Sequence, residues 1–96
     1  MIKLVAKRWL KEGVWEEYTA LAEKLVDQTR LEPGCVDYAL YGVKEDALAV
    51  MMETWADQGS LDAHLARLRA ENWGARLNAY ADPERPPVIE KYLELY

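Results

Sequence analysis

Residues 47–55 alternate in the manner of a β-strand, yet both faces of that strand are largely apolar. One face carries Leu48, Val50, Met52 and Thr54, and the other carries Ala49, Met51, Glu53 and Trp55. An apolar sheet face has to be covered, so we expect cover on both sides of this strand. Helices of the same chain can supply one cover, and a second sheet from a partner chain can supply the other.

Three more segments have strand-like alternation, and three have helical spacing. The strands are predicted at 2–10, 35–43 and 88–95, with a hairpin loop at 42–46 before the strand at 47–55. Apolar residues three and four apart predict helices at 14–31, 58–70 and 72–80. The resulting order is βαββαβ with a broken second helix. It is typical of an α+β, ferredoxin-like domain with an antiparallel sheet.

The boundaries of these elements have local causes. Pro33-Gly34 ends the first helix, because proline cannot continue a helix and glycine tolerates the backbone of its exit. Asp57 is the expected N-cap of the helix at 58–70. The prolines within 82–87 predict a rigid, non-helical connection to the last strand.

Length and charge narrow the class of protein. The 96 residues fit one domain over 1–96. A domain this small buries a limited share of its surface, and pairing with a second copy would bury more of it. A net charge of −5 makes nucleic acid an unfavourable partner. No apolar run is long enough to cross a membrane, so no membrane partner is expected. A single cysteine, Cys35, excludes an internal disulfide and fits a cytoplasmic location.

Three local motifs resemble one known family. Residues 32–38 read Glu-Pro-Gly-Cys-Val-Asp-Tyr, the third strand ends in Glu53-Thr54-Trp55, and the next helix carries Leu61-Asp62-Ala63-His64. In this order and spacing they resemble the antibiotic biosynthesis monooxygenase (ABM) domain, over residues 2–70. The resemblance implies a homodimer whose two sheets pack face to face into an α+β barrel. It also implies a pocket in each subunit, and activities that include cofactor-independent oxygenation of quinols and polycyclic phenols.

His64 and Glu53 are the candidate catalytic residues. A neutral imidazole at position 64, on the edge of the apolar stripe that faces the sheet, can take a proton from a phenolic hydroxyl. Glu53 is predicted to orient that imidazole. The alternative is a structural histidine that bonds Glu53 or a backbone group and fixes the helix on the sheet.

Aromatic residues are the candidate substrate-binding groups. Trp55 points the same way as Glu53 and is predicted to stack on a flat substrate. Trp9, Tyr38 and Trp73 are predicted to line the same cavity, with the tyrosine hydroxyl holding a substrate oxygen. For each of them, packing in the core is the alternative interpretation.

No cofactor or metal is expected. One histidine, one cysteine and scattered carboxylates do not form a recognisable ligand set, and no phosphate-binding loop is present. The heme-degrading branch of the family places its axial histidine where this chain has Gly74. The sequence thus favours a cofactor-independent monooxygenase that binds a small aromatic or apolar ligand. A non-catalytic binding or structural module, or a related isomerase or cyclase, is the alternative, because a fold does not fix a function.

Overall fold

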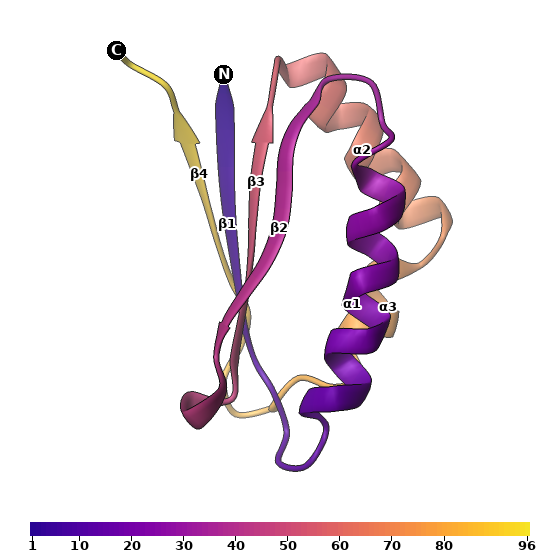
Figure 1. Cartoon of the computed structure of the whole chain (residues 1–96), viewed down its shortest axis with the longest axis vertical. Coiled ribbons are helices and arrows are strands. Elements are labelled where there is room, and N and C mark those ends of the chain that lie inside the picture. The colour runs from indigo at the N-terminus through magenta and orange to yellow at the C-terminus, as the bar shows by residue number, and fades with distance from the viewer.

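Three helices cover one face of a four-stranded antiparallel sheet in the computed structural model, which describes residues 1–96 (Figure 1). The strands are β1 (Ile2–Trp9), β2 (Cys35–Val43), β3 (Leu48–Trp55) and β4 (Val88–Leu93). The helices are α1 (Trp15–Thr29), α2 (Gln58–Ala70) and α3 (Trp73–Asn78), and a 3₁₀ turn, η1, spans Lys44–Asp46. The predicted βαββαβ order and ferredoxin-like α+β fold are confirmed.

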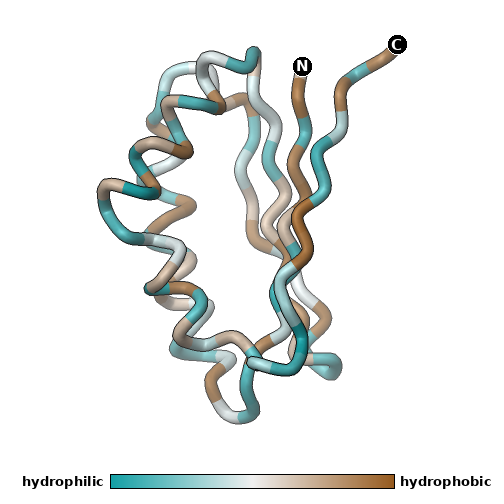
Figure 2. Tube along the Cα trace, turned by 180° about the vertical axis from the view of Figure 1, so that it is seen from behind, coloured by the Kyte–Doolittle hydropathy of each residue, from teal (hydrophilic) through white to brown (hydrophobic).

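The sheet order is β2-β3-β1-β4, so the first strand lies between the third and the fourth. Ile2 pairs with Trp55 of β3 on one side and with Leu93 of β4 on the other. This pairing brings the two ends of the chain to the same end of the sheet, as Figure 2 shows from behind. None of the helices is long and apolar enough to cross a membrane.

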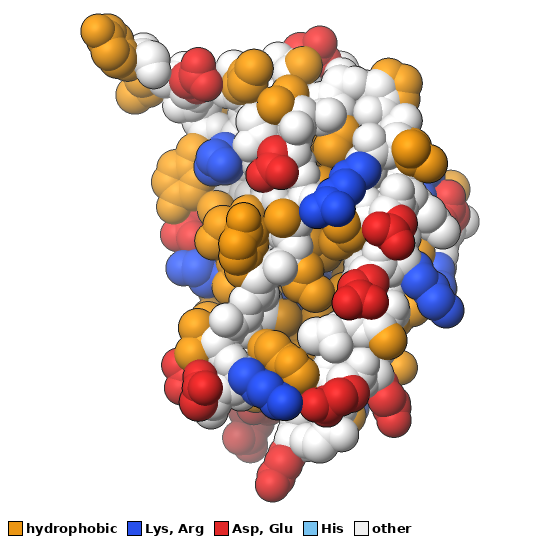
Figure 3. All heavy atoms as spheres, in the orientation of Figure 1, with side chains coloured by type: hydrophobic (Ala, Val, Ile, Leu, Met, Phe, Trp, Pro, Cys, Tyr) orange, Lys and Arg blue, Asp and Glu red, His pale blue; other side chains and the backbone are white.

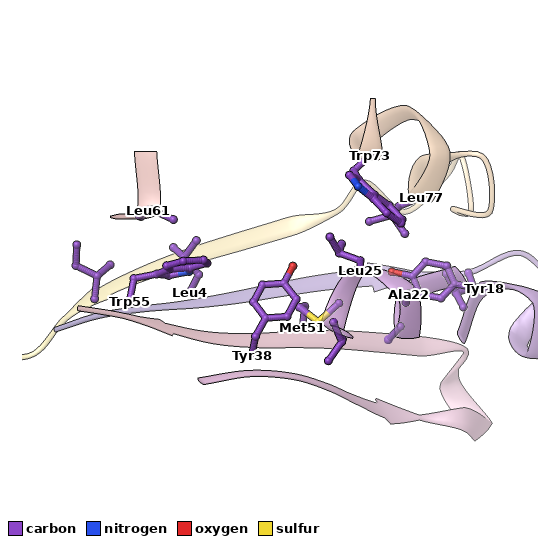
Figure 4. Close-up of a cluster of buried hydrophobic side chains, with 14 residues drawn as sticks. Leu4, Tyr18, Ala22, Leu25, Tyr38, Met51, Trp55, Leu61, Trp73 and Leu77 are labelled. Carbon is purple, nitrogen blue, oxygen red and sulfur yellow. The ribbon is translucent and has the colours of Figure 1, made fainter. Parts of the chain in front are cut away.

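The alternation of side chains in β3 separates two different environments. Residues directly paired across the sheet point to the same face. The helix-covered face therefore carries Trp55, Glu53 and Met51 of β3, together with Ile2 and Leu4 of β1. Figure 4 shows this layer, with Trp55, Tyr38 and Met51 on the sheet beneath Leu61, Trp73 and Leu77 of the helices. The opposite face has no helix over it.

Most boundaries agree with the predictions within two residues, which is the ordinary scatter at element ends. Leu10 leaves the first strand and forms an isolated bridge with Ala81 instead. The predicted hairpin loop at 42–46 begins two residues too early, because β2 continues through Val43, as predicted for the strand at 35–43, and η1 then spans Lys44–Asp46. Asp57 is the N-cap of α2, as expected, and its carboxylate accepts a hydrogen bond from the Ser60 N–H at 2.8 Å.

Gly34 is the tightest point in the connection from α1 to β2. Its φ of +81° is in the left-handed region, and a Cβ at this position would collide with the side chain of Ser60. We expect Gly34→Ala to lower the free energy of unfolding by about 2 kcal/mol, from backbone strain and the collision together. Urea unfolding measures this loss.

Two further variants separate the two causes of that loss. Ser60→Gly, added to Gly34→Ala, removes the collision and should restore only part of the stability. Gly74→Ala is the matched control, because a Cβ there meets no atom within 4 Å. A Gly34→Ala variant as stable as the wild-type protein would show that the connection adapts freely.

Candidate active site

A cavity of about 410 Å³ lies between the helix-covered face of the sheet and the helices. Its wall is mainly apolar, with contributions from Leu4, Ala6, Met51, Leu61, Leu65, Leu68, Trp73 and Leu77. Tyr38 and Glu53 are polar residues in this wall. In Figure 4 the Tyr38 hydroxyl points from the sheet toward the helix layer that bears Trp73. A concave, apolar space of this size with few polar groups is typical of a small-molecule site.

Glu53 is the acidic residue in the cavity wall. It is 6% exposed, and β3 places it beside Tyr38 on one neighbouring strand and Leu4 on the other. Burial raises the pKa of its carboxyl to about 7, despite a 2.9 Å hydrogen bond that Trp55 Nε1 donates to Oε1; the charge of Glu32 also raises it. A carboxyl group with this pKa can take up or release a proton near neutral pH.

His64 lies behind the cavity wall and is fully buried. Its Nδ1 is 2.8 Å from Glu32 Oε2, whereas its Nε2 is 3.9 Å from Glu53 Oε1 and has no hydrogen-bond partner. The imidazole packs against the indole of Trp55, with ring centroids 4.6 Å apart. Burial lowers the pKa of His64, although Glu32 opposes this shift, so the imidazole is neutral at neutral pH.

Glu32 and Arg67 complete the polar cluster and were not among the predicted site residues. Arg67 Nη2 donates to Glu32 Oε2 and to Thr29 Oγ1, at 3.0 Å each. Burial would raise the pKa of Glu32, but hydrogen bonds from Arg67 and His64 outweigh it and lower the pKa, so this group is a carboxylate. Two sequence signals point to these residues: Glu32 begins the Glu-Pro-Gly-Cys motif, and Arg67 is one helical turn from His64.

The four predicted substrate-binding aromatics separate into three positions. Tyr38 and Trp73 line the cavity. Trp55 is fully buried beside His64 and does not form part of the cavity wall. The prediction that Trp9 lines the same cavity is wrong, because Trp9 pairs with Leu48 and both point to the uncovered face of the sheet. There the guanidinium of Arg85 lies 5.0 Å from the Trp9 ring.

Three basic or amide residues at the cavity were also missed by sequence reasoning. Arg8 donates from Nη1 to the Tyr18 hydroxyl at 3.1 Å and from Nε to Asn78 Oδ1 at 3.0 Å. Lys91 Nζ donates to Gln58 Oε1 at 2.6 Å and so joins β4 to the start of α2. Neither cation has a carboxylate partner, so both remain available to a ligand with negative charge.

No group of three or more histidine, cysteine and acidic side chains is arranged to hold a metal ion. Cys35 is half-buried and free. Burial raises the pKa of its thiol, and the charges of Glu32 and Glu53 raise it further, so the reactive thiolate is disfavoured. In the cavity wall, Glu53 can transfer a proton, and aromatic and apolar surfaces can hold a flat molecule.

Comparison with known proteins identifies the family. The antibiotic biosynthesis monooxygenase family profile matches residues 1–76. A conserved protein from Methanosarcina mazei Go1 has 32% identity and a TM-score of 0.84, over 95% of this chain and 89% of that chain. A solved antibiotic biosynthesis monooxygenase has 26% identity and a TM-score of 0.86, over 100% of both chains.

A curated relative is similar over a shorter stretch. An uncharacterized protein of Synechocystis sp. is 36% identical over 50 residues, which cover 51% of this chain and 34% of that protein. The match thus spans about one third of the Synechocystis protein. The family assignment depends on the profile match instead, which agrees with the three motifs and the shared fold. This chain belongs to the antibiotic biosynthesis monooxygenase family.

Proposed function

We propose that this protein is a monooxygenase that uses molecular oxygen on a polycyclic phenol or quinol without a cofactor. The observation that supports this most directly is Glu53, whose carboxyl has a pKa of about 7 and lies in the wall of an apolar cavity of about 410 Å³. Strongly shifted pKa values in a cleft are typical of functional sites. The family of the chain fits the same chemistry.

In the proposed reaction, Glu53 is the general base. Its carboxylate takes the proton of a phenolic hydroxyl, and the electron pair stays on the phenolate oxygen. The electron-rich phenolate reacts with oxygen inside the cavity, where the apolar wall limits access by water. Overall a phenol and O₂ give a quinone and water, so the substrate supplies all the electrons and no external reductant is needed.

Two cavity residues are assigned to substrate binding. Trp73 contributes an aromatic surface on which a planar ring can stack, and the Tyr38 hydroxyl can hold a substrate oxygen close to Glu53. Burial, with the nearby Glu53 charge, raises the pKa of Tyr38, which keeps its hydroxyl protonated and able to donate a hydrogen bond. Trp55 lies outside the cavity wall and donates a hydrogen bond to Glu53 through its indole N–H.

Oxygen uptake tests the proposal. Metal-stripped protein is mixed with a panel of quinols, anthrones and naphthols, with Glu53→Gln in parallel. Saturable uptake that is lost in Glu53→Gln is the expected result. Uptake no faster than the spontaneous reaction across the panel would contradict it. Tight binding without uptake would favour a ligand-binding module of the same fold.

The uncovered face of the sheet supports assembly as a homodimer. It combines exposed or half-buried apolar side chains from all four strands: Val5, Trp9, Ala39, Tyr41, Val43, Leu48, Met52, Val88 and Tyr92. Figure 3 shows hydrophobic side chains at the left, interspersed with basic and acidic ones, where the sheet faces away from the helices. Exposed apolar side chains gathered on one face are typical of an interaction surface, and the Lys7–Glu90 ion pair lies among them. A second copy packed face to face would cover it and close the proposed barrel.

Sedimentation checks this assembly. We expect a species of about 22 kDa, twice the 11.1 kDa chain. Met52→Lys places a charge on the central strand of this face and should shift the protein to the monomer, since an unpaired buried charge is costly. Leu31→Lys is the control, because Leu31 is highly exposed beyond α1 and should not affect assembly. A wild-type monomer at micromolar concentration would contradict the dimer.

A further inference from the structure

The unpartnered nitrogen of His64 is the feature that the proposed function leaves unexplained. Buried polar atoms nearly always have hydrogen-bond partners, and Nε2 of this imidazole has none. It is directed at Glu53, at 3.9 Å from Oε1, while the other ring nitrogen contacts Glu32. His64 therefore bridges the cavity carboxyl and a second carboxylate, Glu32, in the connection from α1 to β2.

The protonation of this imidazole follows from its partner. Glu32 is an ionised carboxylate, so it can only accept a hydrogen bond. Nδ1 must then carry the ring proton, and in the neutral imidazole Nε2 has the free electron pair. This free pair faces Glu53. Nε2 can therefore accept a proton from Glu53, and Nδ1 can release its own proton to Glu32.

Glu32 connects the buried cluster with solvent. Its side chain is 16% exposed, whereas that of His64 is 0% exposed. Arg67 holds the carboxylate of Glu32 in place and is itself partly exposed. A continuous series of groups thus leads from Glu53 through His64 and Glu32 to the protein surface, without passing through the cavity.

The need for such a route follows from the position of Glu53. When a flat aromatic ligand fills the cavity, it lies between Glu53 and the cavity opening. The proton taken from that ligand when the phenolate forms, and the proton needed later when water forms, then cannot pass through the cavity until the product departs. We propose that His64 and Glu32 form a proton relay that carries the proton from Glu53 to solvent behind the bound substrate. This inference rests on the proposed role of Glu53 as the base.

Each step of the relay conserves atoms and charge. The phenolic O–H bond breaks, and its proton binds a carboxylate oxygen of Glu53. That O–H bond then breaks as an N–H bond forms at Nε2 of His64. On the far side, the Nδ1–H bond breaks and the proton binds Oε2 of Glu32, which releases it to water. When the product water forms, a proton returns by the reverse steps, which restores the Nδ1–H form of His64 and leaves no net release of protons. A movement of about 1 Å brings Glu53 and Nε2 from 3.9 Å to hydrogen-bond distance.

The groups around His64 fit this function. Arg67 on α2 favours the ionised form of Glu32 and disfavours a lasting charge on His64. Tyr38 on β2 packs edge-on, with ring centroids 5.4 Å apart, and its raised pKa keeps it neutral. Trp55 on β3 supplies an apolar face. Glu53 and Glu32 are thus the two acidic groups that face the imidazole, one at each nitrogen.

Anaerobic stopped-flow mixing with 4-nitrophenol separates uptake of the proton from its release. Formation of the bound phenolate is followed by its visible absorbance, and release of the proton is followed by a fluorescent pH indicator in weak buffer. In the wild-type protein the two signals should rise together. In His64→Gln the phenolate should form at the normal rate, and in Glu32→Gln at a rate changed only by the loss of the Glu32 charge near Glu53, while in both variants proton release slows at least tenfold. A positioning role alone would slow formation of the phenolate itself.

Glu71→Gln is the matched control. Glu71 accepts hydrogen bonds from Arg67 at 3.2 Å and from Trp73 Nε1 at 3.0 Å, both of which the amide oxygen of glutamine can still accept, and it does not contact His64, so both signals should stay as in the wild-type protein. Glu53→Gln tests the base itself and should abolish the bound phenolate. If Glu53→Gln leaves the phenolate signal unchanged, the proposed function fails. If Glu53→Gln removes it but His64→Gln and Glu32→Gln release protons at the wild-type rate, the relay alone is overturned.

Discussion

Replacement of Glu53 by glutamine is expected to lower the turnover of a phenolic substrate by a factor on the order of 10² to 10⁴, the usual contribution of a positioned general base. The substitution changes little else. Glutamine has the same shape, and its amide oxygen can accept the 2.9 Å hydrogen bond that Trp55 Nε1 now donates to Oε1. The KM should therefore stay nearly constant while kcat falls, as steady-state oxygen uptake will show.

The pH dependence of the same reaction gives a second measurement. A base works only when ionised, so kcat/KM should rise with pH through the pKa of about 7 and then level off. The residual activity of Glu53→Gln should lack this step. Glu23→Gln is the control, because Glu23 is exposed on α1 and does not line the cavity. Full turnover in Glu53→Gln would place the base elsewhere.

The fold could be predicted because its signals are local. Alternation over 47–55 places Glu53 and Trp55 on one face from sequence alone, and the structure keeps them there. The break at Pro33-Gly34 and the cap at Asp57 also depend on only a few neighbouring residues. Such local patterns predict the structure correctly when the tertiary contacts favour the same conformation, as they do in this sheet.

The candidate site was predicted only in part, because its contacts join distant parts of the chain. His64 meets Glu32 across 32 positions, and no periodicity links a loop residue to a helix residue at that distance. The sequence therefore suggested Glu53 as the partner of His64, whereas Glu32 is the residue that bonds it. Arg67 reaches Glu32 from the next turn of α2, which helical spacing alone could not reveal.

Side-chain size and direction explain the errors among the aromatics. Alternation in β1 already separates Trp9 from Ile2 and Leu4, so its assignment to the cavity conflicted with the strand pattern. Trp55 does lie on the cavity side of the sheet, yet α2 covers it completely, with His64 packed on its ring. The packing of the helices on the sheet decides whether a residue lies in the cavity wall or behind it, and this packing is not readable from the sequence.

Glu53 should also make the stability of the protein depend on pH in an unusual direction. Its carboxyl has a pKa of about 7 in the folded protein, against an ordinary value of 4.5, so between these pH values the folded state binds more protons than the unfolded chain. A rise in pH through this window therefore lowers the free energy of unfolding, and the full difference corresponds to about 3 kcal/mol. Glu53→Gln cannot ionise and should not show this loss.

His64 and Glu32 act in the opposite direction and so have to be separated from Glu53. The pKa of each is lowered in the folded protein, so each contributes stability that is lost as the pH falls below its ordinary value. Both contributions are present in the wild-type protein and in Glu53→Gln, and only the part of each that depends on the Glu53 charge differs between them. The difference between the two proteins therefore reports the ionisation of Glu53 together with its coupling to these two groups.

Urea unfolding of both proteins between about pH 5 and pH 8 measures that difference. The stability of Glu53→Gln relative to wild type should rise by about 2.5 kcal/mol across this range, most of the full difference, whatever constant cost the amide adds. Parallel curves would mean that Glu53 ionises as easily in the folded protein as in the unfolded chain, which would remove the basis for its role as a base. A rising difference would show that the fold retains a destabilising carboxyl at the cavity, a cost that is typical of a residue kept for chemistry.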